Sequence, residues 1–212
     1  MNNNLPSWSC PKKSKARLDT IISPYRSFIG QSLPDKKQYW TMCGKSASDG
    51  GTLVRGCELY QVIQDKLITT YDQFHGVEID KDIYNANKQL DCGAHWYCGD
   101  FYQTLIDNSK SFNPGIVNAD LLWMPEYGTI YLSKIMDMLS YLKIQNVLLV
   151  GNFILRNRCM TVSPTEIINQ LEQQPYYRKA MLTDKWSFGE WIYVYNGTGK
   201  NRTVMGSIVF YK

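Results

Sequence analysis

Two short apolar segments, each followed by a carboxylate, constrain the fold of this chain more than any other feature. They cover residues 74–79 and 95–98, and both have strand-like composition. Asp80 and Asp100 follow them, at positions where an aspartate can cap the next helix. Strand-like and helix-like segments alternate in the same way along much of the chain. This alternation predicts an α/β protein with a mostly parallel sheet and helices on both faces.

The other expected elements follow from apolar periodicity and turn signals. The last two segments, residues 190–195 and 202–211, flank a glycine-rich turn and predict an antiparallel hairpin. Residues 45–51 have the composition of a loop. We expect strands at residues 38–43, 74–79, 95–98, 116–119 and 146–154, and helices at residues 14–29 (interrupted by Pro24), 57–67, 101–106 and 131–142. Further helices are expected after Asp80 and from Ser163, with Pro175 as the stop of the latter.

Length and charge restrict the organisation and the partners. The chain has 212 residues, of which 44% are hydrophobic, so residues 14–212 predict a single packed domain after a flexible basic lead, residues 1–13. The net charge of +4 permits a DNA or RNA partner but does not require one. Basic residues gather near the start of the chain and favour nucleic-acid binding or, alternatively, a solvated helix face: Lys12, Lys13, Lys15, Arg17 and Arg26.

The sequence predicts a cytoplasmic protein without a membrane span or a metal. No apolar run reaches the roughly 18–20 residues that a span needs, and residues 1–17 lack the apolar core of a signal peptide. The cysteines should then be reduced. Cys92, His95 and Cys98 lie close together and suggest zinc, with Cys43 and Cys57 as further ligands only through an unusual loop. Their spacing is not that of a paired-cysteine knuckle, so we interpret them as strand or core residues.

Acidic residues at two successive strand ends predict a nucleoside site. Ligands of open α/β sheets bind beyond the carboxyl ends of parallel strands. Glu78 or Asp100 could accept from ribose hydroxyls and the other from an adenine amino group; alternatively, both are ordinary helix caps. The G-x-G-x-x-G and P-loop patterns of phosphate-bearing cofactors are absent, and no Ser/His/Asp arrangement stands out.

From about residue 38 to residue 212, the chain resembles class I S-adenosylmethionine-dependent methyltransferases. The resemblance rests on element order, on residues 76–80 (Gly-Val-Glu-Ile-Asp), on residues 99–101 (Gly-Asp-Phe) and on the terminal hairpin. It implies a Rossmann-like, doubly wound sheet of seven strands, with the last strand inserted antiparallel, and S-adenosylmethionine as cofactor. It places Cys43 and Gly44, in a loop that reaches Gly51, near the methionine moiety of this cofactor. It places Glu78 at the ribose, with Ile79 beside it. Asp100 would contact the adenine amino group, and Phe101 would lie beside the adenine ring.

The end of the fourth strand is where the resemblance places the methyl acceptor. The [DN]-P-P-[YF] motif of amino-methylating enzymes is not met there. Asn118 or Asp120 could still orient a nucleophile, and Trp123 or Tyr127 could stack on a flipped base. Alternatively, Asp120 caps a loop and the two aromatic residues belong to the core.

The resulting functional expectation is a methyltransferase that acts on nucleic acid and needs no metal. A ring-carbon mechanism through a catalytic cysteine is not expected, because no Pro-Cys pair is present. Two alternatives stay open. One is a methyltransferase of a small molecule or protein, and the other is a non-catalytic binding protein with this fold, favoured by the irregular glycine pattern of the first loop.

Overall fold

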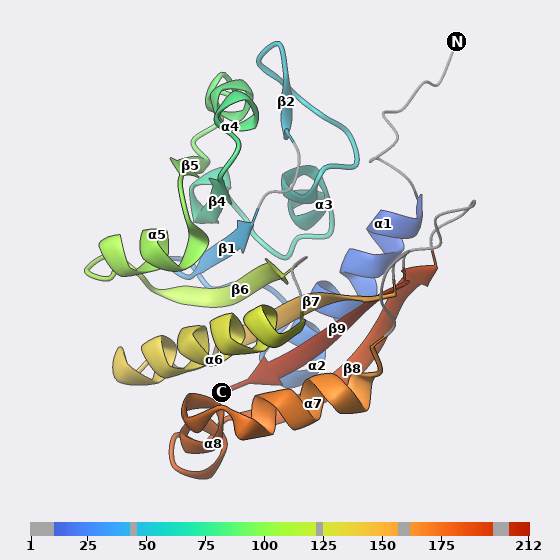
Figure 1. The fold of residues 1–212 in the computed structure, drawn as a ribbon. Coiled ribbons are helices and arrows are strands. Elements are labelled where there is room, and N and C mark those ends of the chain that lie inside the picture. The colour runs from blue at the N-terminus through green and yellow to red at the C-terminus, as the bar shows by residue number, and fades with distance from the viewer. Residues whose placement is uncertain (1–10, 43–45, 122–124, 157–161, 197–203) are drawn as a thin grey trace. The chain divides into compact units, whose positions relative to one another are not determined.

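The computed structural model describes residues 11–42, 46–121, 125–156, 162–196 and 204–212. Figure 1 shows the order of the elements along the chain. The chain divides into two compact units, Met1–Gly115 and Ile116–Lys212.

Strand order confirms the predicted fold class. The described strands include a seven-stranded sheet with the order β5-β4-β1-β6-β7-β9-β8. Neighbours β1, β4 and β5 pair in parallel, as do β6 and β7, whereas β9 is antiparallel to β7 and to β8. The last strand is therefore inserted antiparallel, as predicted. The strands are β1 (Gln38–Met42), β4 (Phe74–Glu78), β5 (His95–Cys98), β6 (Pro114–Leu121), β7 (Leu148–Arg156), β8 (Ser187–Asn196) and β9 (Val204–Tyr211).

In the first unit, the N-terminal helical segment differs from the expected single helix. It consists of α1 (Pro11–Arg17), a π-helical turn η1 (Leu18–Ile22) and α2 (Ser23–Phe28). The helix is interrupted before Pro24, at the π-helical turn η1, and not at the proline itself. Pro24 occupies the first turn of α2. Proline is tolerated there, since the first amides of a helix have no partner in the helix. Helix α1 includes residues 11–13 of the predicted flexible lead, and residues 1–10 lie outside the described residues.

Two predicted capping sites in the first unit are confirmed. Asp80 caps α4 (Lys81–Lys88) through hydrogen bonds from the amides of Asp82 and Ile83, and Asp100 caps α5 (Phe101–Asp107). Helix α3 (Glu58–Gln64) and the short 3-10 helix η2 (Tyr71–Gln73) lie between β1 and β4 in sequence. The core of this unit is aromatic and aliphatic, with Tyr39, Trp40 and Phe74 each at most 1% exposed.

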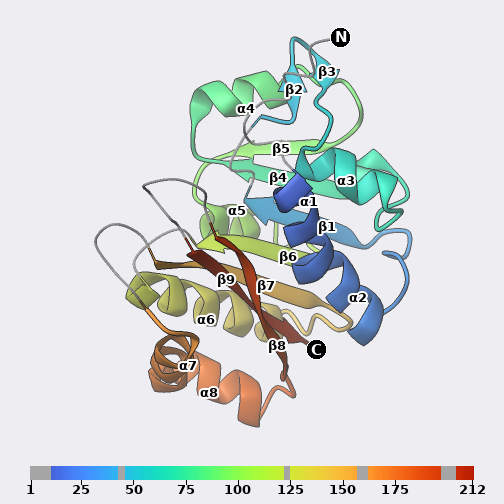
Figure 2. The ribbon, with the colours of Figure 1, turned by 90° about the vertical axis from the view of Figure 1, so that its right-hand side faces the viewer.

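The segment after β1 is not a plain loop. Strands β2 (Ser48–Asp49) and β3 (Thr52–Leu53) pair as a short antiparallel hairpin. Gly50 and Gly51 have positive φ angles of 54° and 81°, which a two-residue hairpin turn requires and which glycine adopts without strain. In both views of the ribbon, β2 lies beside α4 (Figures 1 and 2).

In the second unit, α6, α7 and α8 lie on one side of strands β7, β9 and β8 (Figure 2). Helix α6 (Pro125–Tyr141) begins earlier than expected, and α7 (Pro164–Gln173) has the predicted capping box of Ser163 and Glu166. Pro175 ends α7 as predicted but also begins α8 (Pro175–Leu182), which the sequence reasoning missed. The apolar interior of β7 is fully buried at Leu148, Leu149 and Val150, as expected for a strand covered on both faces.

Candidate functional site

The carboxyl ends of three parallel strands in the first unit meet at one edge. Met42 of β1 is in register with Val77 of β4, and Glu78 is in register with Cys98 of β5. The caps of α4 and α5 follow immediately. This is the edge at which an open α/β sheet binds its ligand, and we name it the donor edge.

Glu78 is the buried carboxylate of the donor edge. Its side chain is 8% exposed, and the Asp80 amide donates a 3.0 Å hydrogen bond to Oε1. Oε2 is also buried and has no hydrogen-bond partner among the described residues. Burial raises the pKa of this carboxyl, and the backbone hydrogen bonds oppose that rise. A buried acceptor without a donor costs about 1–3 kcal/mol, so the site fits a ligand that brings hydroxyl donors, such as a ribose.

Ile79 offers an open apolar surface beside that carboxylate. Its side chain is 75% exposed, whereas the predicted adenine neighbour, Phe101, is 2% exposed. Phe101 lies in the first turn of α5 with its ring in the core, which leaves almost no surface for a ligand. Of the two apolar residues predicted for the cofactor site, Ile79 is the one with area to contact a planar base.

Asp100 shows the capping role that the sequence allowed as its alternative. Its Oδ1 accepts a 2.8 Å hydrogen bond from the Gln103 amide, and the residue is exposed. Its adenine role stays a prediction. Cys43 and Gly44, the remaining residues predicted for the cofactor, lie outside the described residues.

The second unit contains a polar row that sequence reasoning found only in part. Asn118 of β6 is 5% exposed, and its Oδ1 accepts a 2.9 Å hydrogen bond from Asn152 Nδ2 in β7. Ser207 Oγ in β9 donates to Asn152 Oδ1. Asp120, Asn152 and Ser207 are in register across these three strands. The available signal was a polar residue inside an apolar strand, because a buried amide needs a partner.

Of the two aromatic residues predicted to stack on the methyl acceptor, the structure describes Tyr127 but not Trp123. Tyr127 lies in the first turn of α6 and is 66% exposed, so the alternative that made it a core residue is wrong. Trp123 lies outside the described residues. Asp120 is half-buried at the end of β6.

Arginines of the basic segment are used in structural contacts. Arg17 Nη1 donates to the Gly56 carbonyl at 2.9 Å and to Gln61 Oε1 at 3.3 Å. Arg26 Nη2 donates to the Asp65 carbonyl at 2.5 Å. These bonds fasten the N-terminal helices to α3, and Lys15 pairs with Asp19 in the same helical segment. Contacts of the lysines of α1 with a nucleic acid stay a prediction.

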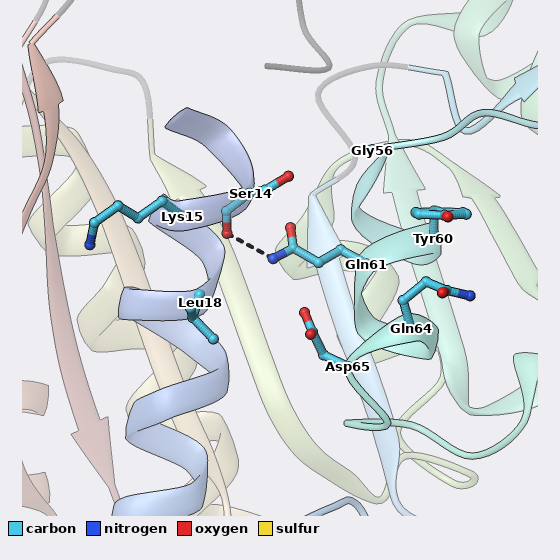
Figure 3. A pocket seen from close by; sticks show the side chains of 8 residues that line it. All are labelled: Ser14, Lys15, Leu18, Gly56, Tyr60, Gln61, Gln64 and Asp65. Atoms are coloured by element: carbon cyan, nitrogen blue, oxygen red, sulfur yellow. Dashed lines mark hydrogen bonds between the residues drawn. The ribbon is translucent and has the colours of Figure 1, made fainter. Parts of the chain in front are cut away.

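A cleft of about 310 Å³ lies between the N-terminal helices and α3 (Figure 3). Gln61 Nε2 donates across it to the Ser14 carbonyl at 2.7 Å, and Lys15 extends away from α3. None of the described residues predicted for the cofactor lines this cleft. Its lining is Ser14, Lys15, Leu18, Gly56, Tyr60, Gln61, Gln64 and Asp65.

The described part of the chain contains neither a cluster of metal ligands nor a helix that could span a membrane. There, no group of three or more His, Cys, Asp or Glu side chains is placed to hold a metal. Likewise, no described helix combines the length and the apolar character needed to cross a membrane.

Comparison by sequence found no relatives: no protein-family model and no curated protein matches this chain. Comparison by structure found similar solved proteins, among them three with TM-scores of at least 0.50. Trm5b from Pyrococcus abyssi has a TM-score of 0.54 and 10% identity over 95% of this chain and 49% of its own, so this chain spans about half of that protein.

Two of these structures match over most of their own length. An S-adenosylmethionine-dependent methyltransferase from Clostridium acetobutylicum has a TM-score of 0.51 and 7% identity, over 94% of this chain and 90% of its own. TYW2 from M. jannaschii, solved in complex with AdoMet, has a TM-score of 0.50 and 7% identity, over 98% of this chain and 78% of its own. With the strand order above, these similarities show that the fold is that of class I S-adenosylmethionine-dependent methyltransferases.

Proposed function

We propose that this protein is an S-adenosylmethionine-dependent methyltransferase whose cofactor binds at the donor edge. The observation that carries the proposal is Glu78, a buried carboxylate at the end of β4 with one oxygen that lacks a donor among the described residues. The fold supports it, as does the similarity to the methyltransferase from C. acetobutylicum and to TYW2 from M. jannaschii, which was solved with AdoMet.

Three described residues of the donor edge would hold the cofactor. Glu78 accepts from the ribose hydroxyls, Ile79 covers one side of the adenine, and Asp100 accepts from the adenine amino group. When bound, S-adenosylmethionine supplies an electrophilic methyl group on its sulfonium. The chain's own contribution is to fix the nucleoside, exclude water from the apolar side and leave the methyl group open to an acceptor.

Asn118 and Asp120 are our candidates for orienting the acceptor. The hydrogen bond from Asn152 holds the Asn118 amide in one orientation. A polar group fixed in this way can keep a nucleophile's lone pair in line for displacement. Tyr127, exposed at the start of α6, is available for stacking on a planar acceptor.

Nucleic acid is the acceptor class that we propose. The support is the net charge of +4 and the lysines Lys12, Lys13 and Lys15 of α1. A methyltransferase of proteins or small molecules, and a donor-binding protein without turnover, are the competing outcomes. Labelled methyl transfer into RNA, DNA, protein and metabolite pools separates them.

The test of the donor site is Glu78→Gln, with Asp82→Ala as its matched control. The glutamine of this variant would place an amide where the carboxylate accepts, so we expect roughly 10- to 100-fold weaker binding of S-adenosylhomocysteine by calorimetry. The unfolding temperature of Glu78→Gln at pH 7 should not fall below that of the parent, because a buried charge is removed. Asp82 is an exposed carboxylate in the first turn of α4, and its loss should leave affinity unchanged.

The two readouts keep binding and folding apart. Parent-like affinity in Glu78→Gln would show that the carboxylate does not hold the ligand. A large drop in unfolding temperature together with parent-like affinity would identify Glu78 as a structural residue.

A further inference from the structure

The cleft between the N-terminal helices and α3 has walls that are held in place without a ligand. Gln61 is 8% exposed and joins the two walls, since its Nε2 donates to the Ser14 carbonyl and its Oε1 accepts from Arg17 Nη1. Arg17 also donates to the carbonyl of Gly56, which lines the cleft. The volume of about 310 Å³ is at the lower end of the range for small-molecule pockets. The cleft is therefore preformed and suits one small ligand group.

The backbone beside the cleft departs from a regular α-helix where the lining is apolar. Leu18 lines the cleft and is the first residue of the π-helical turn η1. The Ser23 amide closes this turn by donating to the Leu18 carbonyl, five residues back. Single π-helical turns are rare and occur frequently at functional sites. Leu18 is 39% exposed, so the cleft offers an apolar surface to a ligand at this turn.

Three polar side chains line the cleft from α3 and its C-cap: Tyr60, Gln64 and Asp65. Among the described residues, none of these three side chains has a hydrogen-bond or ion-pair partner. Figure 3 shows the Asp65 carboxylate turned toward the space between α3 and the N-terminal helices. This wall therefore presents an aromatic ring, an amide and a carboxylate that are available to a ligand.

This set of groups fits an unpaired nucleobase better than it fits a phosphate or a hydrocarbon chain. The Asp65 carboxylate repels a phosphate, and the lysine of the lining, Lys15, is already paired with Asp19. A hydrocarbon chain would cover polar groups without giving them partners. A nucleobase has a flat face that stacks on an aromatic ring such as Tyr60, and a polar edge that accepts and donates hydrogen bonds.

We propose that the cleft binds one unpaired base of a single-stranded nucleic acid. The inference rests on the proposed function, because it concerns the acceptor class named there. The base lies against Tyr60 and Leu18, and its exocyclic amino group donates to Asp65. Gln64 donates to the ring nitrogen beside that amino group. No methyl transfer is assigned to the cleft, since none of the described residues predicted for the cofactor lines it.

The carboxylate predicts a base preference. Adenine and cytosine carry an amino group next to a ring nitrogen that accepts, whereas uracil carries carbonyl oxygens in place of the amino group. A carboxylate accepts from the amino group and is repelled by the carbonyl oxygens. The cleft therefore prefers adenine or cytosine over uracil, and Asp65 is the residue that sets this preference.

Fluorescence anisotropy with short labelled oligo(A), oligo(C) and oligo(U) tests the base preference. The parent should bind oligo(A) and oligo(C) roughly tenfold more tightly than oligo(U). In Asp65→Asn this ratio should fall toward one, because the charged acceptor is lost. Asp35→Asn is the matched control: Asp35 is exposed, lies outside the lining and carries the same charge, so its replacement should keep the parent's ratio.

Stacking is tested with Tyr60→Ala. This variant should bind all three oligonucleotides roughly tenfold more weakly, because stacking on an aromatic ring tolerates every base. Tyr84→Ala is its control, since Tyr84 is another half-buried helical tyrosine of the same unit and does not line the cleft. Its affinities should match those of the parent. Asp65→Asn removes no buried apolar surface and carries the test if Tyr60→Ala does not fold.

The possible outcomes separate this inference from the proposed function. If the parent binds the three oligonucleotides equally, or if Asp65→Asn keeps the parent's ratio, the cleft does not read a base and the inference is overturned. Equal losses in Tyr60→Ala and Tyr84→Ala also overturn it. If the parent binds S-adenosylhomocysteine but no oligonucleotide, the nucleic-acid acceptor and this inference fail together, while the donor site stands. A base preference that depends on Asp65 in a protein that binds no S-adenosylhomocysteine supports the cleft and contradicts the donor site.

Discussion

Glu78 illustrates how far single residues could be assigned from sequence. Its place at the end of a strand allowed either a ligand-binding acid or an ordinary helix cap, and the family resemblance favoured the ligand-binding role. Its burial and the absence of a described donor for Oε2 required the packed structure, because they depend on what surrounds the side chain. The opposite happened at Phe101, which the family resemblance placed beside the adenine ring and whose ring is packed in the core.

His75 is a buried histidine with a direct effect on acid stability. Its ring stacks on Trp40 at 4.4 Å and on His95 at 4.5 Å between centroids, and Nδ1 lies 3.1 Å from the Tyr97 hydroxyl. Burial, helped by the neighbouring His95, lowers the pKa of His75 to about 3. The ring therefore stays neutral in the folded protein at pH values where it would be protonated in the unfolded chain.

This pKa difference predicts a loss of stability on acidification. The unfolded state binds the extra proton below about pH 6.5, so the contribution of His75 is fully present above that pH and decreases as the pH falls toward 3. We expect the parent to lose about 2 kcal/mol more than His75→Phe between pH 7 and pH 5. Urea unfolding at the two pH values measures this, and equal losses in parent and variant would contradict the assignment.

At the scale of the elements, local sequence signals were sufficient to predict where several helices begin. Asp80, Asp100 and Ser163 each cap the helix that the sequence assigned to them. Capping depends on a few consecutive residues, so it can be read without tertiary information. Helix α8 was missed because Pro175 is both a helix terminator and a favourable first residue, and only packing on the rest of its unit decides between these roles.

The N-terminal helices carry a prediction about nucleic-acid binding. Replacing Lys12, Lys13 and Lys15 with glutamine should weaken binding to single-stranded RNA and reduce the salt slope by roughly 0.7 for each phosphate that is no longer neutralised. The unfolding temperature should stay close to that of the parent, because Arg17 and Arg26 make the contacts to α3 and the Lys15–Asp19 ion pair that is lost is exposed.

The matched control replaces three exposed lysines elsewhere, Lys110, Lys134 and Lys143. It changes the net charge by the same amount but leaves the lysines of α1 in place. If these lysines contact the nucleic acid, the control should therefore weaken binding much less. Equal effects of the two triple variants would indicate unspecific attraction by net charge, and no RNA or DNA binding by the parent at low salt would remove this partner from the proposal.

For the whole molecule, the proposed ligand should stabilise the fold by mass action. S-adenosylhomocysteine at 100 times its dissociation constant should raise the free energy of unfolding by about 2.7 kcal/mol. NADH is the control, because the sequence lacks the glycine pattern that a pyrophosphate needs. Denaturant titration with each compound measures the difference, and the absence of any shift with millimolar S-adenosylhomocysteine would count against the donor site.

The sequence by itself determined the α/β class of this protein, its capping residues and its terminal hairpin, and it offered Glu78 as a candidate for a ligand-binding acid. The alternation of strands and helices, the capping aspartates and the terminal hairpin are local patterns, and the single hand of parallel connections reduces the possible sheet orders without fixing one of them. The tertiary structure alone decided the rest. Packing buried Glu78 Oε2 away from every described hydrogen-bond donor and placed the Phe101 ring in the core. It also joined Asn118 to Asn152 and the β2–β3 hairpin to Asn87 by hydrogen bonds. Each of these depends on residues that are distant in the chain, and no local pattern encodes such contacts.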